Sequence, residues 1–207
     1  MAAGDLWIDG APATVEDLTH QALVNYGAYT SFAVSAGSVR GLDRHLARLT
    51  HAGTVLFGVP VPEPRVRELI RHALGDRSDA FVRVSLFSRD ISPRSPSHEG
   101  PPGVMVGVFP PVSPLGETPL RLQLQTYARE IPDLKHVATM GLILARRQAR
   151  LAGYDDALFV DVEGHISEGS LWNIGFVRDD TVIWPEAPML EGVSQALIKR
   201  SEEHTSE

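Results

Sequence analysis

Hydrophobic positions along the chain follow two periods, one typical of helices and one typical of strands. Two segments, 42–56 and 64–73, carry apolar residues at helical spacing and are followed by Gly58 and Gly75. Glycine readily adopts the left-handed conformation that closes a helix, so these glycines predict helix ends. A proline at position 64 suits the first turn of the second helix. The same periodicity predicts a third long helix over residues 140–151.

Short apolar runs bounded by turn residues predict strands between these helices. The expected strands cover residues 6–8, 29–34, 38–40, 81–87, 104–109, 120–126, 157–161, 165–168, 172–178 and 181–184. The pairs Asp9-Gly10 and Ala36-Gly37 are typical of hairpin turns, which predicts a hairpin at each. Thr14 is the expected N-cap of a short helix over residues 14–18.

The order of these elements predicts an α+β protein with two subdomains and largely antiparallel or mixed sheets. Residues 88–103 are rich in Pro, Ser and Gly, which favours a mobile surface loop. Prolines between 110 and 114 mark the best boundary in the chain. We therefore expect an N-terminal α+β subdomain at 1–112, a linker at 113–118 and a C-terminal subdomain at 119–199.

Composition excludes several functional classes. A length of 207 residues leaves room for one large or two small domains. The net charge of -7, without a basic cluster, argues against a nucleic-acid surface. There is no cysteine, and the eight histidines are scattered, so we expect no disulfide and no metal site. No apolar run is long enough to span a bilayer, and we expect a cytoplasmic protein without membrane partners.

The final residues, 200–207, have a sequence that resembles a translated sequencing adapter. We expect this tail to be non-native and the natural chain to continue past Lys199.

Lysine usage gives the first chemical indication. Of 19 basic residues only Lys135 and Lys199 are lysines. Arginine keeps its proton in proteins, whereas a lysine can become a neutral amine and bond covalently to an aldehyde. Lys135 is therefore a candidate nucleophile, although a solvated surface charge is the simpler interpretation.

Four segments, in this order, resemble class IV aminotransferases, the fold-type IV pyridoxal-phosphate enzymes. They are Gly41 to Leu49, Lys135, Gly153 to Phe159 with Ile166 to Ile174, and Leu190 to Ser194. The resemblance covers about residues 6–198. It implies a two-subdomain, D-amino-acid-aminotransferase-like architecture whose C-terminal, cofactor-binding subdomain is incomplete here.

The resemblance also implies how pyridoxal 5'-phosphate is held. Lys135 would form the internal aldimine and later move the substrate's α-proton. Glu168 would stabilise the protonated pyridine nitrogen, and Leu190 would lie against one face of the ring. Arg48 would bind the phosphate together with Val193 and Ser194, where Ser194 is expected to cap a new helix.

Other side chains are candidates for the substrate pocket. Tyr29, Tyr127 and Arg129 could line it and bind a carboxylate. His45 and His136 are either acid–base groups or, more simply, packed residues beside basic neighbours.

Some positions depart from the family pattern. Met140 stands where branched-chain members carry a tyrosine, which argues against a close branched-chain relative, and Gln195 replaces a common arginine. The later phosphate-binding turn of the family does not occur in the chain. The predicted function is therefore an aminotransferase that moves an amino group between an amino acid and a 2-oxo acid, as a homodimer when full length. The alternatives are a lyase of the aminodeoxychorismate type and a cofactor-binding or regulatory domain without turnover.

Overall fold

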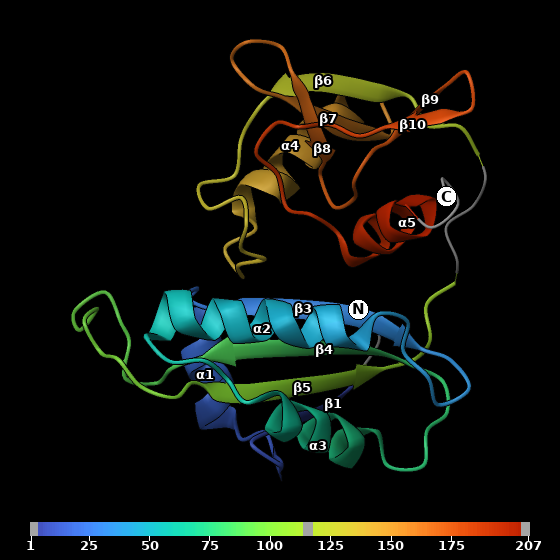
Figure 1. Ribbon diagram of the computed structural model, residues 1–207. Helices are drawn as coiled ribbons and strands as arrows, with labels where there is room; N and C mark the ends of the chain where they lie inside the picture. Colours follow the sequence, from blue (N-terminus) through green and yellow to red (C-terminus); the bar gives the residue numbers. More distant parts are fainter. Residues whose placement is uncertain (1–3, 114–117, 204–207) are drawn as a thin grey trace. The chain divides into compact units, whose positions relative to one another are not determined.

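A computed structural model describes residues 4–113 and 118–203 (Figure 1). These residues form two compact units. The first contains residues 4–113 together with Lys135–Ala138, and the second contains 118–134 and 139–203. Most of the expected linker, at 114–117, and the end of the expected tail, at 204–207, lie outside the described residues.

The first unit is built on a five-stranded sheet in the order β2-β1-β5-β4-β3, and all neighbouring strands are antiparallel (Figure 1). Its strands are β1 (Asp5–Ile8), β2 (Ala11–Pro12), β3 (Ala28–Val34), β4 (Ala80–Phe87) and β5 (Gly103–Phe109). The hairpin predicted at Asp9-Gly10 is confirmed, since β1 pairs with β2 across it. The second predicted hairpin is wrong, because residues 38–40 form no strand and β3 pairs with β4 over its whole length. Only Ser35 and Ser38 form an isolated bridge at that turn, and the next helix follows too closely for a longer ladder.

Three helices accompany this sheet: α1 (Val15–Leu23), α2 (Leu42–Phe57) and α3 (Glu63–Leu74). Helix α2 packs on β3, and α3 packs on β5 and β1 (Figure 1). The two helices also contact each other. The predicted ends are confirmed, because Gly58 and Gly75 are the C-caps, with φ of 75° and 55°. The core between the helices and the sheet includes Leu46, Leu49 and Val82, which are at most 1% exposed.

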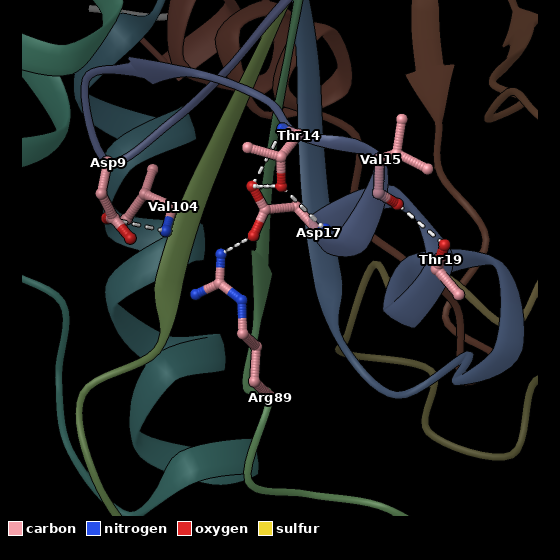
Figure 2. Close-up of polar contacts among 7 residues, drawn as sticks. All are labelled: Asp9, Thr14, Val15, Asp17, Thr19, Arg89 and Val104. Carbon is pink, nitrogen blue, oxygen red and sulfur yellow. Dashed lines mark hydrogen bonds and ion pairs between the residues drawn. The ribbon is translucent and has the colours of Figure 1, made fainter.

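Local polar contacts determine where α1 begins (Figure 2). Asp17 N donates to Thr14 Oγ1 at 3.2 Å, and Thr14 N donates to Asp17 Oδ2 at 3.0 Å, which is a capping box. Thr14 is therefore the N-cap, as predicted, but the helix continues to Leu23 instead of residue 18. The backbone hydrogen bond from Thr14, helped by the ion pair with Arg89, lowers the pKa of Asp17 to about 2.

Asp9 connects the neighbouring turn to β5, because Val104 N donates to Asp9 Oδ1 at 3.2 Å (Figure 2).

The second unit has a three-stranded sheet in the order β6-β7-β8. Its elements are β6 (Leu122–Thr126), α4 (Met140–Leu151), β7 (Asp156–Val160), β8 (Ile166–Gly169), β9 (Phe176–Arg178), β10 (Thr181–Ile183) and α5 (Val193–Glu203). Strands β6 and β7 are parallel and are connected through α4, whereas β7 and β8 are antiparallel and β9 and β10 form a separate antiparallel pair. The helix predicted at 140–151 is confirmed at both ends. Its buried face packs Leu142, Ala145 and Ala149 against Ala157 and Phe159 of β7.

The strand predicted at 172–178 begins later, at Phe176, because residues 168–173 form a tight turn. Glu168 and Asn173 bridge its ends, and Gly169 N donates to Trp172 O at 2.8 Å. Across residues 4–113 and 118–203, no helix combines the length and the apolar character that crossing a membrane would need.

Candidate active site

Lys135 belongs to the first unit, although we expected it in the C-terminal subdomain. Strand β3 is the last strand of its sheet, so one edge has backbone groups available for pairing. Tyr29 N donates to Lys135 O at 2.8 Å, and Val137 N donates to Gly27 O at 2.9 Å. The backbone of the Lys135 segment is therefore held on the edge of β3 by a short antiparallel pairing.

The Lys135 side chain shares an aromatic neighbour with Arg83. Lys135 Nζ lies 5.1 Å from the centre of the Tyr29 ring, and Arg83 Cζ lies 3.6 Å from it. Tyr29 is only 8% exposed, and cations at these distances interact favourably with an aromatic face. Burial also lowers the pKa of the Arg83 guanidinium. Arg83 was not among the residues predicted for the site. The feature of the sequence that points to it is a lone arginine within the apolar strand Ala80–Phe87.

Helix α2 faces the other side of β3 and carries Arg48 and His45. Alternation along the strand turns Thr30 away from Tyr29, and Thr30 Oγ1 lies 2.6 Å from His45 Nδ1. Burial, followed by the positive charges of Arg48 and Lys135, lowers the pKa of His45 to about 4. His45 is thus neutral near pH 7, which supports its interpretation as a packed residue. Arg48 lies one turn further along α2 and is partly buried.

In the second unit, Glu168 is a buried carboxylate with two donors on one oxygen. Arg129 Nε donates to Glu168 Oε1 at 2.7 Å, and Leu190 N donates to the same oxygen at 3.3 Å. The side chains of Arg129 and Glu168 are 4% and 5% exposed. Both contacts fall on Oε1, so within the part of the chain that the structure describes Oε2 can accept a further proton donor. The substrate role expected for Arg129 stays a prediction, since its Nε is bound to Glu168 here.

Leu190 and the start of α5 lie in one continuous segment that Asn173 holds. Asn173 Nδ2 donates to Leu190 O at 2.8 Å, while the backbone of Asn173 bridges Glu168. Leu190 is 5% exposed. Helix α5 begins at Val193, so Ser194 lies inside the first turn and is not the N-cap that we expected. The N–H groups of a first helical turn lack partners within the helix and favour anions, which fits a phosphate.

Tyr127 is placed against the core of the second unit. Its ring lies 4.7 Å from that of Phe159, and its hydroxyl approaches Gly141 at the start of α4. Burial raises the pKa of the Tyr127 hydroxyl. Met140, the position where the family pattern has a tyrosine in branched-chain members, is 80% exposed. The substrate role of Tyr127 stays a prediction.

Each of the two units combines helices with β-strands, as expected for an α+β protein. The chain matches the family described as Amino-transferase class IV over residues 27–205, and it belongs to that family. The predicted family and fold class are thereby confirmed.

The chain is similar to a "Probable branched-chain-amino-acid aminotransferase" of Rickettsia felis, with 28% identity over 93% of this chain and 72% of that protein. Among solved structures it resembles the branched-chain amino acid aminotransferase from Thermobaculum terrenum in its PLP form. The TM-score is 0.81 and the identity 20%, over 95% of this chain and 72% of that one. It also resembles the 4-amino-4-deoxychorismate lyase from Pseudomonas aeruginosa, with a TM-score of 0.71 and 24% identity over 96% of this chain and 77% of that one.

These likenesses establish the family and the fold.

Proposed function

We propose that the protein is a pyridoxal-phosphate-dependent aminotransferase that moves an amino group between an amino acid and a 2-oxo acid. The observation that carries this proposal is Lys135. It is one of only two lysines in the chain, its backbone is fixed by the edge of β3, and its amine lies 5.1 Å from the centre of a buried tyrosine ring. A fixed backbone limits the positions that the amine can reach, which a covalent attachment site requires.

The chemical type of each proposed residue suits one group of the cofactor. Its aldehyde needs an amine, for which we propose Lys135, and its ring nitrogen needs a carboxylate, for which we propose Glu168. Its phosphate needs fixed donors, for which we propose Arg48 and the first turn of α5 at Val193 and Ser194. Leu190, which is buried, would offer an apolar surface to the ring. When bound, pyridoxal phosphate supplies an electron sink for the carbanion formed at the substrate's α-carbon.

The protein's own groups would do three things in this reaction. Lys135, once released, would take and return the proton at the substrate α-carbon. Glu168, kept beside Arg129, would hold a proton on the ring nitrogen through a charge-assisted hydrogen bond. Tyr29, Tyr127 and Arg129 are the proposed substrate contacts.

The names of the curated relatives favour a branched-chain amino acid as donor. The likeness to the aminodeoxychorismate lyase extends to the fold alone. We further propose that the full-length protein is a homodimer, since closed two-fold dimers are the commonest symmetric assemblies.

Reduction with borohydride in the presence of pyridoxal phosphate tests the central proposal. We expect a pyridoxyl group covalently attached to the peptide that contains Lys135, located by mass spectrometry. Lys199→Ala should keep the label, and Lys135→Ala should lose it while remaining folded. A label that persists in Lys135→Ala would contradict the assignment. Assays of 2-oxo acid and pyruvate formation over an amino-acid panel then separate the transferase from the lyase.

A further inference from the structure

A second buried carboxylate, Asp156, lies next to the turn that carries Glu168. Asp156 is the first residue of β7 and is only 3% exposed. Four groups surround its carboxylate. Ser170 Oγ and Ala157 N donate to Oδ1, at 2.6 and 2.8 Å. Trp172 Nε1 donates to Oδ2 at 3.1 Å, and Arg146 Nε lies 3.5 Å from the same oxygen. A buried charge is costly unless several such donors surround it.

Two of the donors to Asp156, Ser170 and Trp172, belong to the segment that follows β8. The ladder between β7 and β8 reaches its end at the pair Leu158 and Gly169. Beyond Gly169 the chain turns back, and none of the strands in the described ranges 4–113 and 118–203 pairs with Ser170 or Trp172 in this sheet. Ser170 and Trp172 are instead both bonded to Asp156. Asp156 therefore anchors this turn to the start of β7 through two side chains.

The position of this turn determines the position of Glu168. The turn is tight, because Gly169 N donates to Trp172 O at 2.8 Å and Glu168 bridges Asn173. The Trp172 indole also covers Gly169 so closely that a Cβ at Gly169 would lie 2.1 Å from it. A displaced Trp172 would consequently move the backbone that directly follows Glu168.

We propose that Asp156 is a positioning residue for Glu168: through Ser170 and Trp172 it fixes the turn that presents the Glu168 carboxylate to the cofactor's ring nitrogen. This inference rests on the proposed function, because it takes Glu168 as the partner of that nitrogen. It assigns Asp156 a role in cofactor recognition and not in folding alone.

The test compares pyridoxal phosphate with an analogue that has a C–H group in place of the ring nitrogen, with both dissociation constants measured by calorimetry. If Glu168 contacts the nitrogen, the wild-type protein should prefer pyridoxal phosphate by about ten- to a hundred-fold. Asp156→Asn should lose about ten-fold of this preference, because its amide turns a donor toward the Trp172 N–H. A purely structural defect would weaken both ligands equally and leave the ratio unchanged.

Asp155→Asn is the matched control. Asp155 is the preceding residue, and its carboxylate faces the more exposed Arg121, so the preference should stay at the wild-type value. Trp172→Phe keeps the ring and removes only the donor, and it should reduce the preference in the same direction as Asp156→Asn. It also provides the test should Asp156→Asn fail to fold.

The outcomes separate the inference from the function beneath it. A wild-type protein without the preference would overturn the role of Glu168 and this inference with it. A wild-type protein with the preference, and Asp156→Asn and Trp172→Phe variants that retain it, would overturn the inference alone. In a Glu168→Gln background, adding Asp156→Asn should leave the ratio unchanged, which is the result expected if Asp156 acts through Glu168.

Discussion

Arg129 and Glu168 form a buried ion pair in which Arg129 Nε donates to Glu168 Oε1 at 2.7 Å, 39 residues apart in the sequence. Both side chains are at most 5% exposed, so neither charge is well solvated. In such a setting the loss of one partner leaves the other charge uncompensated, whereas the loss of both is less costly. The pair thus makes the orientation of Glu168 dependent on Arg129.

The first prediction follows from this dependence. Arg129→Met should lower the free energy of unfolding by about 3 kcal/mol, because it leaves the Glu168 carboxylate buried without its cation. The double variant Arg129→Met with Glu168→Leu should recover part of that loss. Urea unfolding of the wild-type protein, both single variants and the double variant measures the coupling. Additive losses would show that the two groups do not interact in solution.

Much of the fold could be predicted because local rules decide it. The spacing of apolar residues in the sequence predicts the helix over 140–151. The ends of α2 and α3 are predictable because glycine readily adopts the left-handed conformation that closes a helix. The wrong hairpin after β3 has a different cause. The Ala36-Gly37 turn is present, with φ of 46° and 71°, but the partner of β3 is β4, which is distant in the sequence.

The candidate site was less predictable for the same reason. The family pattern predicts site roles for Lys135 and Glu168. No local rule indicates that the backbone of Lys135 pairs with Tyr29 or that Arg129 bonds to Glu168. Asp156 is next to an equally acidic Asp155 in the sequence, and only burial distinguishes the two. These relationships depend on tertiary packing between distant segments.

A second prediction concerns Gly27, which pairs with the Lys135 segment. A Cβ at Gly27 would lie 2.3 Å from Leu86 O, a backbone atom that cannot move without shifting β4. Gly27→Ala should therefore destabilise the protein by about 1–3 kcal/mol. It should also slow the labelling of Lys135 by pyridoxal phosphate and borohydride, because Gly27 O accepts from Val137 N at 2.9 Å. Unchanged labelling and stability in this variant would argue against the edge pairing.

A third prediction concerns assembly. The full-length protein should sediment with twice the mass of its chain over a wide concentration range, as expected for a closed two-fold dimer. Sedimentation equilibrium combined with an activity assay at the same dilutions provides the measurement. A monomer with full activity would contradict this expectation.

The last prediction is a pH dependence of stability that His45 causes. Burial lowers the pKa of His45 to about 4 from an ordinary value of 6.5, so the unfolded chain binds a proton at His45 before the folded chain does. Stability should then fall as the pH drops from 6.5 to 4, by an amount on the order of 2–3 kcal/mol for this one group.

Replacing His45 with Asn should flatten that part of the profile, although it also lowers stability at pH 7 through the lost contact with Thr30. His51→Asn is the matched control, since His51 is on the same helix but exposed, and it should leave the slope unchanged. Unfolding in urea at half-unit pH steps measures the slope, and a profile of His45→Asn parallel to that of the wild-type protein would show that His45 is not the group responsible.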